Sequence, residues 1–132
     1  MNLDAIATSW APRLLSVLRI MAGLLFLQHG TAKHLKFPVV PNFAKLDPTS
    51  MPGIAGYLEL VGGVLLILGL FTRCTAFVLS GLMAVAYFMA HNPRGFFPIL
   101  NAGELAVLYC FVFLYIAAAG AGPWSIDAMR RK

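Results

Sequence analysis

The sequence predicts an all-α membrane protein, a bundle of four transmembrane helices in a single domain over residues 1–132. Three observations predict this class. Hydrophobic residues make up 60% of the chain and charged residues only 11%, whereas about a quarter of the residues in a soluble domain are charged. The mean hydropathy is +0.81. Finally, the apolar residues form four stretches of about 20 residues, the length of helix that crosses the hydrocarbon core of a bilayer.

The four predicted spans cover approximately residues 12–30, 52–71, 72–91 and 100–120. Pro12 and Pro52 open the first two, because proline lacks an N–H and is tolerated in the first turn of a helix. Asn92-Pro93 ends the third span, and the Gly-Ala-Gly-Pro stretch at 120–123 ends the fourth. The helix boundaries therefore coincide with residues that start or stop helices.

The connections between the spans differ in length. Only Thr72 and Arg73 separate the second span from the third, so the two form a tight hairpin in which Thr72 is expected to cap the third helix. The connection at 31–51 is longer and partly apolar, which indicates a short interfacial segment on the membrane surface, with a re-entrant segment as the alternative. No cleaved signal peptide is expected, because Asp4 precedes the first positive charge at Arg13.

Two further patterns concern how the helices pack. The order histidine, Phe-Pro, glutamate occurs twice, which indicates two helical hairpins in parallel repeat: His29, Phe37-Pro38, Glu59 and then His91, Phe97-Pro98, Glu104. Small residues recur at i, i+4 spacing on the last two spans: Ala76, Ser80, Ala84 and Ala102, Ala106, Cys110. Such stripes let helices approach closely in lipid, where no hydrophobic force drives their association.

The charges predict an orientation and exclude one class of partner. An even number of spans puts both termini on one side, where five basic residues lie: Arg13, Arg73, Arg130, Arg131 and Lys132. Four lie on the other side: Lys33, Lys36, Lys45 and Arg94. This small excess predicts cytoplasmic termini. Basic residues scattered over helix ends do not form a nucleic-acid surface. The expected partners are the bilayer and either other proteins or a second copy of the chain.

Ionisable residues within spans are candidate functional residues, because each costs about 3 kcal/mol at the membrane centre. The predicted topology brings His29, Glu59, His91 and Glu104 to the side opposite the termini, with Lys33 and Asn101 nearby. Three interpretations fit this cluster. The residues pair and lock the bundle; or they line a pocket for a polar ligand such as a quinone headgroup and exchange protons with it; or the histidines bind a metal or haem.

The third interpretation is disfavoured. Two histidines are too few to specify a metal site, and the C-x-x-C-H motif of haem attachment is missing from the sequence. Neither metal nor haem is therefore expected. A quinone is the one cofactor that the cluster suggests.

Arg19 and the remaining charges have simpler interpretations. Arg19 lies within the first span, where it either reaches the terminal-side headgroups, the interpretation that helical side-chain direction favours, or pairs with Glu59. Arg73 and Arg94 lie at helix ends as structural or lipid-facing charges. The sequence contains no phosphate loop, serine elbow or HExxH motif, so no catalytic residue can be assigned. A self-sufficient enzyme is not expected, although a subunit of a membrane oxidoreductase remains open.

The chain resembles the DoxX family of small four-helix membrane proteins, which includes DoxD-like members. Four segments that together cover nearly the whole chain are similar to family motifs: LRIMAGLLFLQHGTAKHLKFP, GYLELVGGVLLILGLFTR, AYFMAHNPRGFFPILNAGELAVLY and GPWSID. The resemblance implies a multi-pass protein of the bacterial inner membrane. By analogy it marks eight positions as important: Arg19, His29, Lys33, Glu59, Arg73, His91, Asn101 and Glu104.

The resemblance also implies a functional context. The family looks like the DoxD-type subunit of thiosulfate:quinone or terminal-oxidase systems, and other members are linked to thiols and oxidative stress. We therefore expect an accessory subunit of a quinone- or thiol-linked redox system. The alternatives are a non-catalytic scaffold or assembly factor and an oligomeric small-solute transporter. Fold-level likeness cannot by itself supply a reaction.

Overall fold

The computed structural model describes residues 2–132 as a set of helices, and this part of the chain contains no β-strand. The prediction of an all-α protein is confirmed. Four helices are long: α1 (Leu3–His34), α2 (Met51–Leu68), α3 (Thr72–Ala86) and α5 (Glu104–Ala119). The others are short: η1 (Pro41–Phe43), η2 (Tyr87–His91), η3 (Asn92–Arg94), α4 (Pro98–Asn101) and α6 (Ile126–Arg130).

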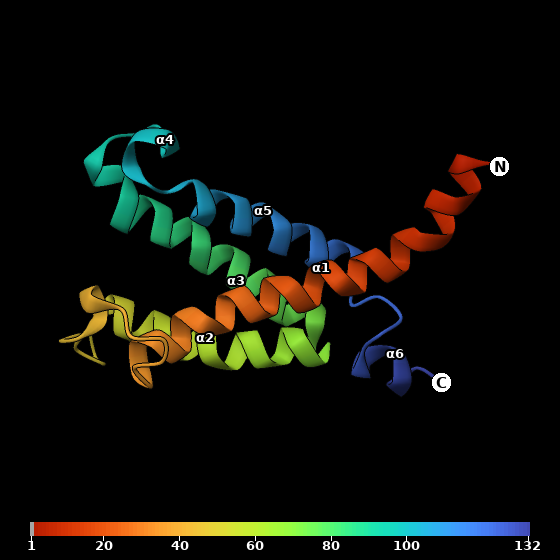
Figure 1. The fold of residues 1–132 in the computed structure, drawn as a ribbon, viewed down its shortest axis with the longest axis horizontal. Coiled ribbons are helices and arrows are strands. Elements are labelled where there is room, and N and C mark those ends of the chain that lie inside the picture. Colours follow the sequence, from red (N-terminus) through yellow and green to blue (C-terminus); the bar gives the residue numbers. More distant parts are fainter. Residues whose placement is uncertain (1) are drawn as a thin grey trace.

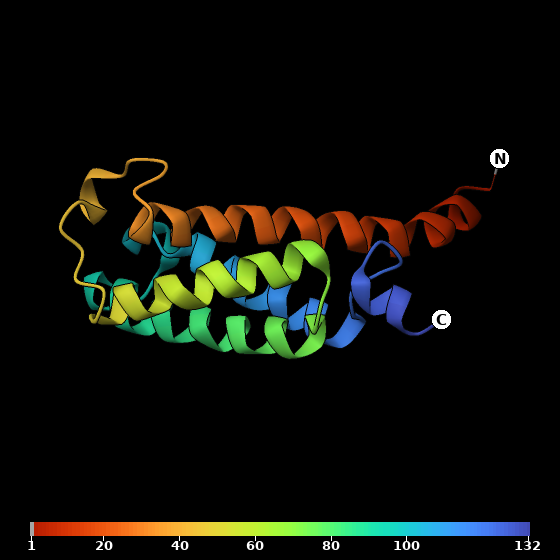
Figure 2. The ribbon, with the colours of Figure 1, turned by 90° about the horizontal axis from the view of Figure 1, so that it is seen from below.

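The long helices run up and down in turn and pack as two antiparallel pairs, α1 with α2 and α3 with α5 (Figure 1). The connection at 35–50 and the short α4 lie at one end, which we call the loop end. The α2–α3 turn and α6 lie at the other, the terminal end, beyond which the first turns of α1 project (Figure 2). The hairpins expected from the repeated histidine–glutamate order are thus the two packed pairs.

Three helical stretches are long and apolar enough to cross a membrane: Leu3–His34, Met51–Leu68 and the continuous run Thr72–Arg94, which joins α3, η2 and η3. The predicted fourth span at 100–120 is interrupted. It begins in α4, breaks at Ala102, whose φ of 59° is left-handed, and continues as the shorter apolar helix α5. The structure therefore supports three spans plus one shorter apolar helix.

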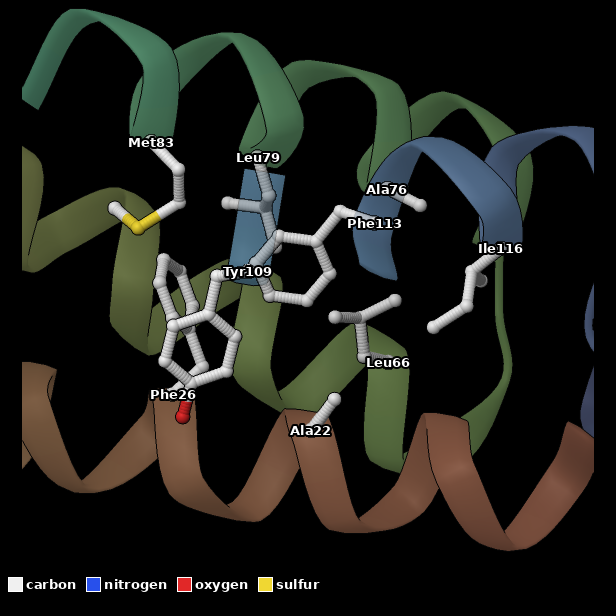
Figure 3. Packing of buried hydrophobic residues seen from close by; sticks show 9 residues of the cluster. All are labelled: Ala22, Phe26, Leu66, Ala76, Leu79, Met83, Tyr109, Phe113 and Ile116. Carbon is white, nitrogen blue, oxygen red and sulfur yellow. The ribbon is translucent and has the colours of Figure 1, made fainter. Parts of the chain in front are cut away.

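The core lies between the two pairs and contains few large side chains. The Phe26 ring of α1 meets Tyr109 and Phe113 of α5 edge-on, with ring centroids 5.5 and 5.1 Å apart (Figure 3). Leu66 and Leu79, from α2 and α3, fill the rest of the centre. Most other large apolar side chains point outward, as expected where lipid replaces water as the surroundings.

Glycines let α1 and α2 approach more closely than any side chain would allow. A Cβ built on Gly30 would lie 2.7 Å from the backbone nitrogen of Leu60 and 2.9 Å from the carbonyl oxygen of Gly56. A Cβ on Gly63 would lie 2.9 Å from Cα of Leu27. Because the obstructing atoms belong to the backbone, a methyl group at either position must push the helices apart.

The α3–α5 pair uses the small residues that the sequence analysis identified. Ala76 and Ala106 are buried in this interface, and the Ser80 hydroxyl donates a 2.7 Å hydrogen bond to the carbonyl of Cys110. Interhelical hydrogen bonds of this kind stabilise helix pairs where no hydrophobic force acts between helices. The close packing predicted for these stripes is confirmed at these positions.

The glycine contacts predict opposite effects for the same substitution at two sites. Gly30→Ala should lower the free energy of unfolding by about 2 kcal/mol, because overpacking forces the α1 and α2 backbones apart. Gly81→Ala should raise it by about 0.5–1 kcal/mol, because a Cβ at Gly81 meets nothing within 4 Å and alanine is the better helix former. Unfolding of the detergent-solubilised protein measures both. Equal effects would contradict the close approach at Gly30.

Candidate functional site

A buried ion pair joins α1 to α2 near the loop end. Lys33, in the last turn of α1, lies 2.8 Å from Oε1 of Glu59 on α2, and the two residues are 9% and 4% exposed. The second carboxylate oxygen, Oε2, is buried and has no hydrogen-bond partner. The pair is therefore half-satisfied: one oxygen binds Lys33, and the other has no hydrogen-bond partner within residues 2–132.

Gly56 explains how this pair fits between the helices. A Cβ there would lie 2.5 Å from Nε2 of His34 and 3.1 Å from Cδ of Lys33, so both side chains cross α2 over this glycine. His34 binds the Gly53 carbonyl at 2.7 Å and stacks on the Tyr57 ring at 4.0 Å. The sequence analysis missed His34. Its position four residues after Gly30, on the face that meets α2, is the signal that identifies it.

The α1–α2 connection lies over the ion pair. The Phe43 ring, in η1, has its centroid 5.7 Å from the Lys33 ammonium, a cation–π distance. Lys36 joins the connection to the end of α1, because its ammonium donates to the carbonyls of Lys33 at 3.1 Å and Phe43 at 2.6 Å. The segment predicted to be interfacial thus covers the one buried ion pair among residues 2–132.

A second polar cluster forms where α3 passes through the π-turn η2. The Asn101 amide donates to the Tyr87 hydroxyl at 3.2 Å and the Gly95 carbonyl at 2.7 Å, and its Oδ1 accepts from the Gly103 amide at 2.8 Å. Nδ1 of His91 lies 3.0 Å from the Asn101 carbonyl. Asn101 is thus fully hydrogen-bonded. Its contacts hold the break between α4 and α5 against the end of α3.

The structure brings only part of the predicted cluster together. Lys33 pairs with Glu59, and His91 bonds to Asn101, but no hydrogen bond or ion pair within residues 2–132 joins these two groups. His29 is half-buried and Arg94 is exposed. Glu104 is exposed in a shallow open groove of about 430 Å³ beside α4 and α5, with apolar neighbours: Pro98, Ile99, Ala102, Leu105 and Leu108.

Arg19 does not reach the headgroups, as the side-chain direction had favoured, nor does it pair with Glu59. It is 0% exposed, and its guanidinium donates to three backbone carbonyls: Leu66 at 2.8 Å, Trp124 at 2.6 Å, and Ala121. The expectation failed because the guanidinium binds the Ala121 and Trp124 carbonyls in the segment after α5 and shares the Leu66 carbonyl with the Gly69 amide. A planar group with five N–H bonds satisfies several of them at once.

The terminal end uses two other charged groups as helix caps. Arg73 donates to the carbonyls of Ala117, at 3.1 Å, and Ala118 in the last turn of α5. Asp127 of α6 accepts from the amides of Phe71 at 3.0 Å and Thr72 at 2.9 Å, where α3 begins. The predicted cap by Thr72 is wrong, because Thr72 is the first residue of the helix and Phe71 occupies the N-cap position.

No group of three or more histidine, cysteine, aspartate or glutamate side chains within residues 2–132 could hold a metal ion. Cys74 is an exposed free thiol, and Cys110 is a half-buried one. The donors and acceptors available at the loop end are Lys33, Glu59 and His29, with the rings of Tyr57 and Phe43 beside them.

These features define a small membrane protein with several apolar helices and charged groups buried between them. The chain belongs to the DoxX family, whose model matches residues 14–92. It is 48% identical over 124 residues to an uncharacterized protein of Haemophilus influenzae, which covers 89% of this chain and 91% of the relative. It is also 28% identical to an uncharacterized membrane protein of Mycobacterium tuberculosis, with coverages of 92% and 88%. No solved structure gives a significant match.

The role of Arg19 is tested by removing its donors. Arg19→Met keeps the approximate length of the side chain but removes the donor of the Ala121 and Trp124 carbonyls and one of the two donors of the Leu66 carbonyl, so the free energy of unfolding should fall by about 3 kcal/mol. Arg13→Met, on the exposed part of the same helix, should change it by less than about 0.5 kcal/mol. Chemical unfolding in detergent measures both. An Arg19→Met variant as stable as the parent would contradict this role.

The Asp127 cap predicts a pH dependence. Partial burial acts to raise the pKa of the Asp127 carboxyl, but the hydrogen bonds from the Thr72 and Phe71 amides and the nearby Arg131 outweigh it and hold the pKa below the ordinary 3.8. A carboxyl with a lowered folded-state pKa contributes stability above its unfolded pKa. That contribution is lost as the pH falls through the folded pKa.

The unfolding midpoint should therefore drop as the pH is lowered from about 5 to about 3. In Asp127→Ala, the part of this drop that comes from the cap should be absent, and the midpoint at neutral pH should already be lower. Asp4→Ala is the control, because Asp4 lies in the exposed first turn of α1. A parent and an Asp127→Ala variant with the same pH profile would contradict the cap.

Proposed function

We propose that this chain is a membrane subunit of a quinone- or thiol-linked redox system, and that the Lys33–Glu59 pair is its site for a quinone headgroup and for proton exchange. In this proposal the chain crosses the bacterial inner membrane four times, the fourth crossing being α4 and α5 together. The termini face the cytoplasm, and the loop end lies at the opposite interface. The buried pair is then near one headgroup layer, where a quinone ring can reach it.

The observation that carries the proposal is the free oxygen of Glu59. A carboxylate within an apolar helix is costly, and an unsatisfied buried oxygen adds to that cost. A pair that served only to lock α1 to α2 would be expected to use both oxygens. A half-satisfied carboxylate beside an ammonium group instead offers one acceptor and one donor to a ligand.

The chemistry of a quinone fits these two groups. The Lys33 ammonium can donate a hydrogen bond to a quinone carbonyl. The hydroxyl of the reduced quinol can donate to Oε2 of Glu59, which exchanges that proton. Reduction to the quinol takes two electrons and two protons, and in this proposal the electrons come from a redox partner subunit. In this proposal His29, which is half-buried one turn before Lys33, passes protons to the pair.

The surroundings of the pair support a ring-shaped ligand. Phe43 and Tyr57 present aromatic faces next to Lys33 and His34, and the exposed side chains of Phe37 and Val39 continue this apolar surface along the connection. Binding sites for small molecules are mostly apolar with a few placed polar groups. A quinone with an apolar tail matches that composition.

A scaffold function is the second candidate, and a different observation favours it. The α3–α5 connection exposes four large apolar side chains at the loop end: Phe96, Phe97, Ile99 and Leu100. The hydrogen bonds of Asn101 hold this segment in one conformation. A fixed apolar surface of this kind suits contact with a larger membrane partner. Cross-linking from this segment to a stable protein partner, without any quinone binding, would favour the scaffold.

The proposed site predicts which carboxylate a quinone requires. Glu59→Gln and Lys33→Met should each weaken the binding of a short-chain ubiquinone analogue by about tenfold, the effect of losing one charge-assisted hydrogen bond. Glu104→Gln, which changes an exposed glutamate at the same end, should leave the affinity unchanged. Calorimetric titration of the purified protein in detergent measures the affinities, and the unfolding midpoint of each variant shows that it is folded.

Two results would contradict the site. If Glu59→Gln and Lys33→Met bind the analogue as the parent does, the quinone is not held by this pair. If the parent does not bind it, the ligand is wrong and the scaffold candidate gains support.

A further inference from the structure

Three arginines converge on a groove at the terminal end of the bundle, away from the Lys33–Glu59 pair. The groove has a volume of about 310 Å³ and is formed by residues 71–74 at the start of α3 and by Asp127, Arg130 and Arg131 of the α6 segment. Figure 2 places α6 at the terminal end, the same end as the α2–α3 turn. Arg73 approaches the groove from α3, and the other two arginines approach it from the C-terminal segment.

Each arginine has an identifiable restraint or charge partner. Arg73 is tied to the carbonyls at the end of α5 through one terminal nitrogen, Nη1. Arg130 lies over the Phe71 ring, with its guanidinium carbon 5.3 Å from the ring centroid. Arg131 is the charge close to the Asp127 carboxyl. Side chains that are already restrained lose less conformational entropy when they bind a ligand.

The charge of the groove favours an anion. Asp127 is its one acidic residue, and both of its oxygens accept hydrogen bonds from the amides at the start of α3. The helix end is thus already satisfied by a group of the chain itself. Three guanidinium groups against one carboxylate leave two positive charges in excess. Arginine binds phosphate oxygens through two parallel N–H bonds, which gives such a cluster a preference for phosphate.

The surface beside the groove suits acyl chains. Cys74 lines the groove, and Phe77 and Val78 follow it at i+3 and i+4 on the same face of α3. All three side chains are exposed, Phe77 to 66%. Because α3 belongs to a membrane-spanning stretch, this face borders lipid. A phosphate in the groove would therefore have an apolar track directly below it.

We propose that the groove is a binding site for the phosphate of an anionic phospholipid headgroup, such as phosphatidylglycerol, whose acyl chains lie along the Cys74–Val78 face of α3. The phosphate is held by Arg130 and Arg131, with Arg73 at the edge of the site. The bound lipid ties α6 to the start of α3 and so reinforces the terminal end. This proposal does not depend on quinone binding at the loop end.

The test is lipid binding by the full chain in detergent, measured by native mass spectrometry with dioleoyl-phosphatidylglycerol, with dioleoyl-phosphatidylcholine, and with inorganic phosphate. The parent should retain phosphatidylglycerol about tenfold better than the zwitterionic lipid and should not retain free phosphate. Arg130→Ala/Arg131→Ala should abolish this preference. Arg94→Ala/Lys45→Ala removes the same charge from the other end of the chain and should preserve it.

Two further variants separate the phosphate-binding part of the site from its apolar part. Arg130→Lys/Arg131→Lys keeps the charge but loses the two-pronged geometry, so an intermediate preference supports binding through the arginine forks. Phe77→Ser removes an apolar side chain from the Cys74–Val78 face and should weaken the binding of phosphatidylglycerol. The protein should remain folded, as its unfolding midpoint would show.

Three results would overturn the proposal: equal retention of the two lipids by the parent, retention of free phosphate as strong as that of the lipid, or an equal loss of preference in the Arg94/Lys45 control. The last would mean that overall charge, and not this groove, attracts the lipid. None of these outcomes bears on the quinone titration at Lys33 and Glu59.

Discussion

The buried guanidinium of Arg19 is the interaction on which the terminal end of the bundle depends. Water cannot satisfy the carbonyls left free at a helix end inside a membrane protein, so another part of the chain must do so. Arg19 on α1 reaches the carbonyl of Leu66 near the end of α2 and two carbonyls after α5. One side chain thereby joins three segments. Gly69 makes room for it, because a Cβ there would lie 2.9 Å from the guanidinium carbon.

Backbone groups at helix ends need hydrogen-bond partners at both ends of the bundle, and different side chains supply them. At the terminal end, Arg19, Arg73 and Asp127 all bind backbone groups at helix ends, so these charges serve the fold. At the loop end, Asn101 has this role for the α4–α5 break. Lys33 and Glu59 differ, because the side chains meet each other and no helix end needs them. Their burial is not explained by backbone satisfaction, which is why they are the strongest candidates for binding.

Composition and helix-ending residues were sufficient to predict the class of fold. The apolar stretches located α2 and α3 to within a few residues, with Pro52 in the first turn of α2. The predicted start of the first span at Pro12 is wrong, because α1 begins at Leu3 and Pro12 lies inside it. The break at Ala102 was missed, because alanine gives no local sign of a left-handed backbone. The pairing of Lys33 with Glu59 agrees with the first interpretation of the polar cluster, in which its residues pair and lock the bundle. His34 was overlooked because, in the sequence, a histidine at the end of a helix looks the same as a histidine at the membrane interface.

The long-range partners could not be predicted, for a reason that applies to Arg19 and Asp127 alike. Both bind backbone groups more than 40 residues away in sequence, Leu66 for Arg19 and Thr72 for Asp127. A sequence pattern shows which side chains are costly in a membrane but not which backbone groups lack partners, since those arise only when the helices end and pack. A buried charge in a span therefore has two explanations: a helix end that needs it, or a ligand.

The unpaired oxygen of Glu59 distinguishes this residue from the charges that bind helix ends. Where a charge serves a helix end, the structure supplies a partner for it, as it does for the guanidinium of Arg19 and for both oxygens of Asp127. Glu59 lies on α2 between Gly56 and Gly63, where the α1 and α2 backbones approach closely. The packing that buries this oxygen leaves it without a hydrogen-bond partner within residues 2–132, and this observation is the one behind the proposed ligand site.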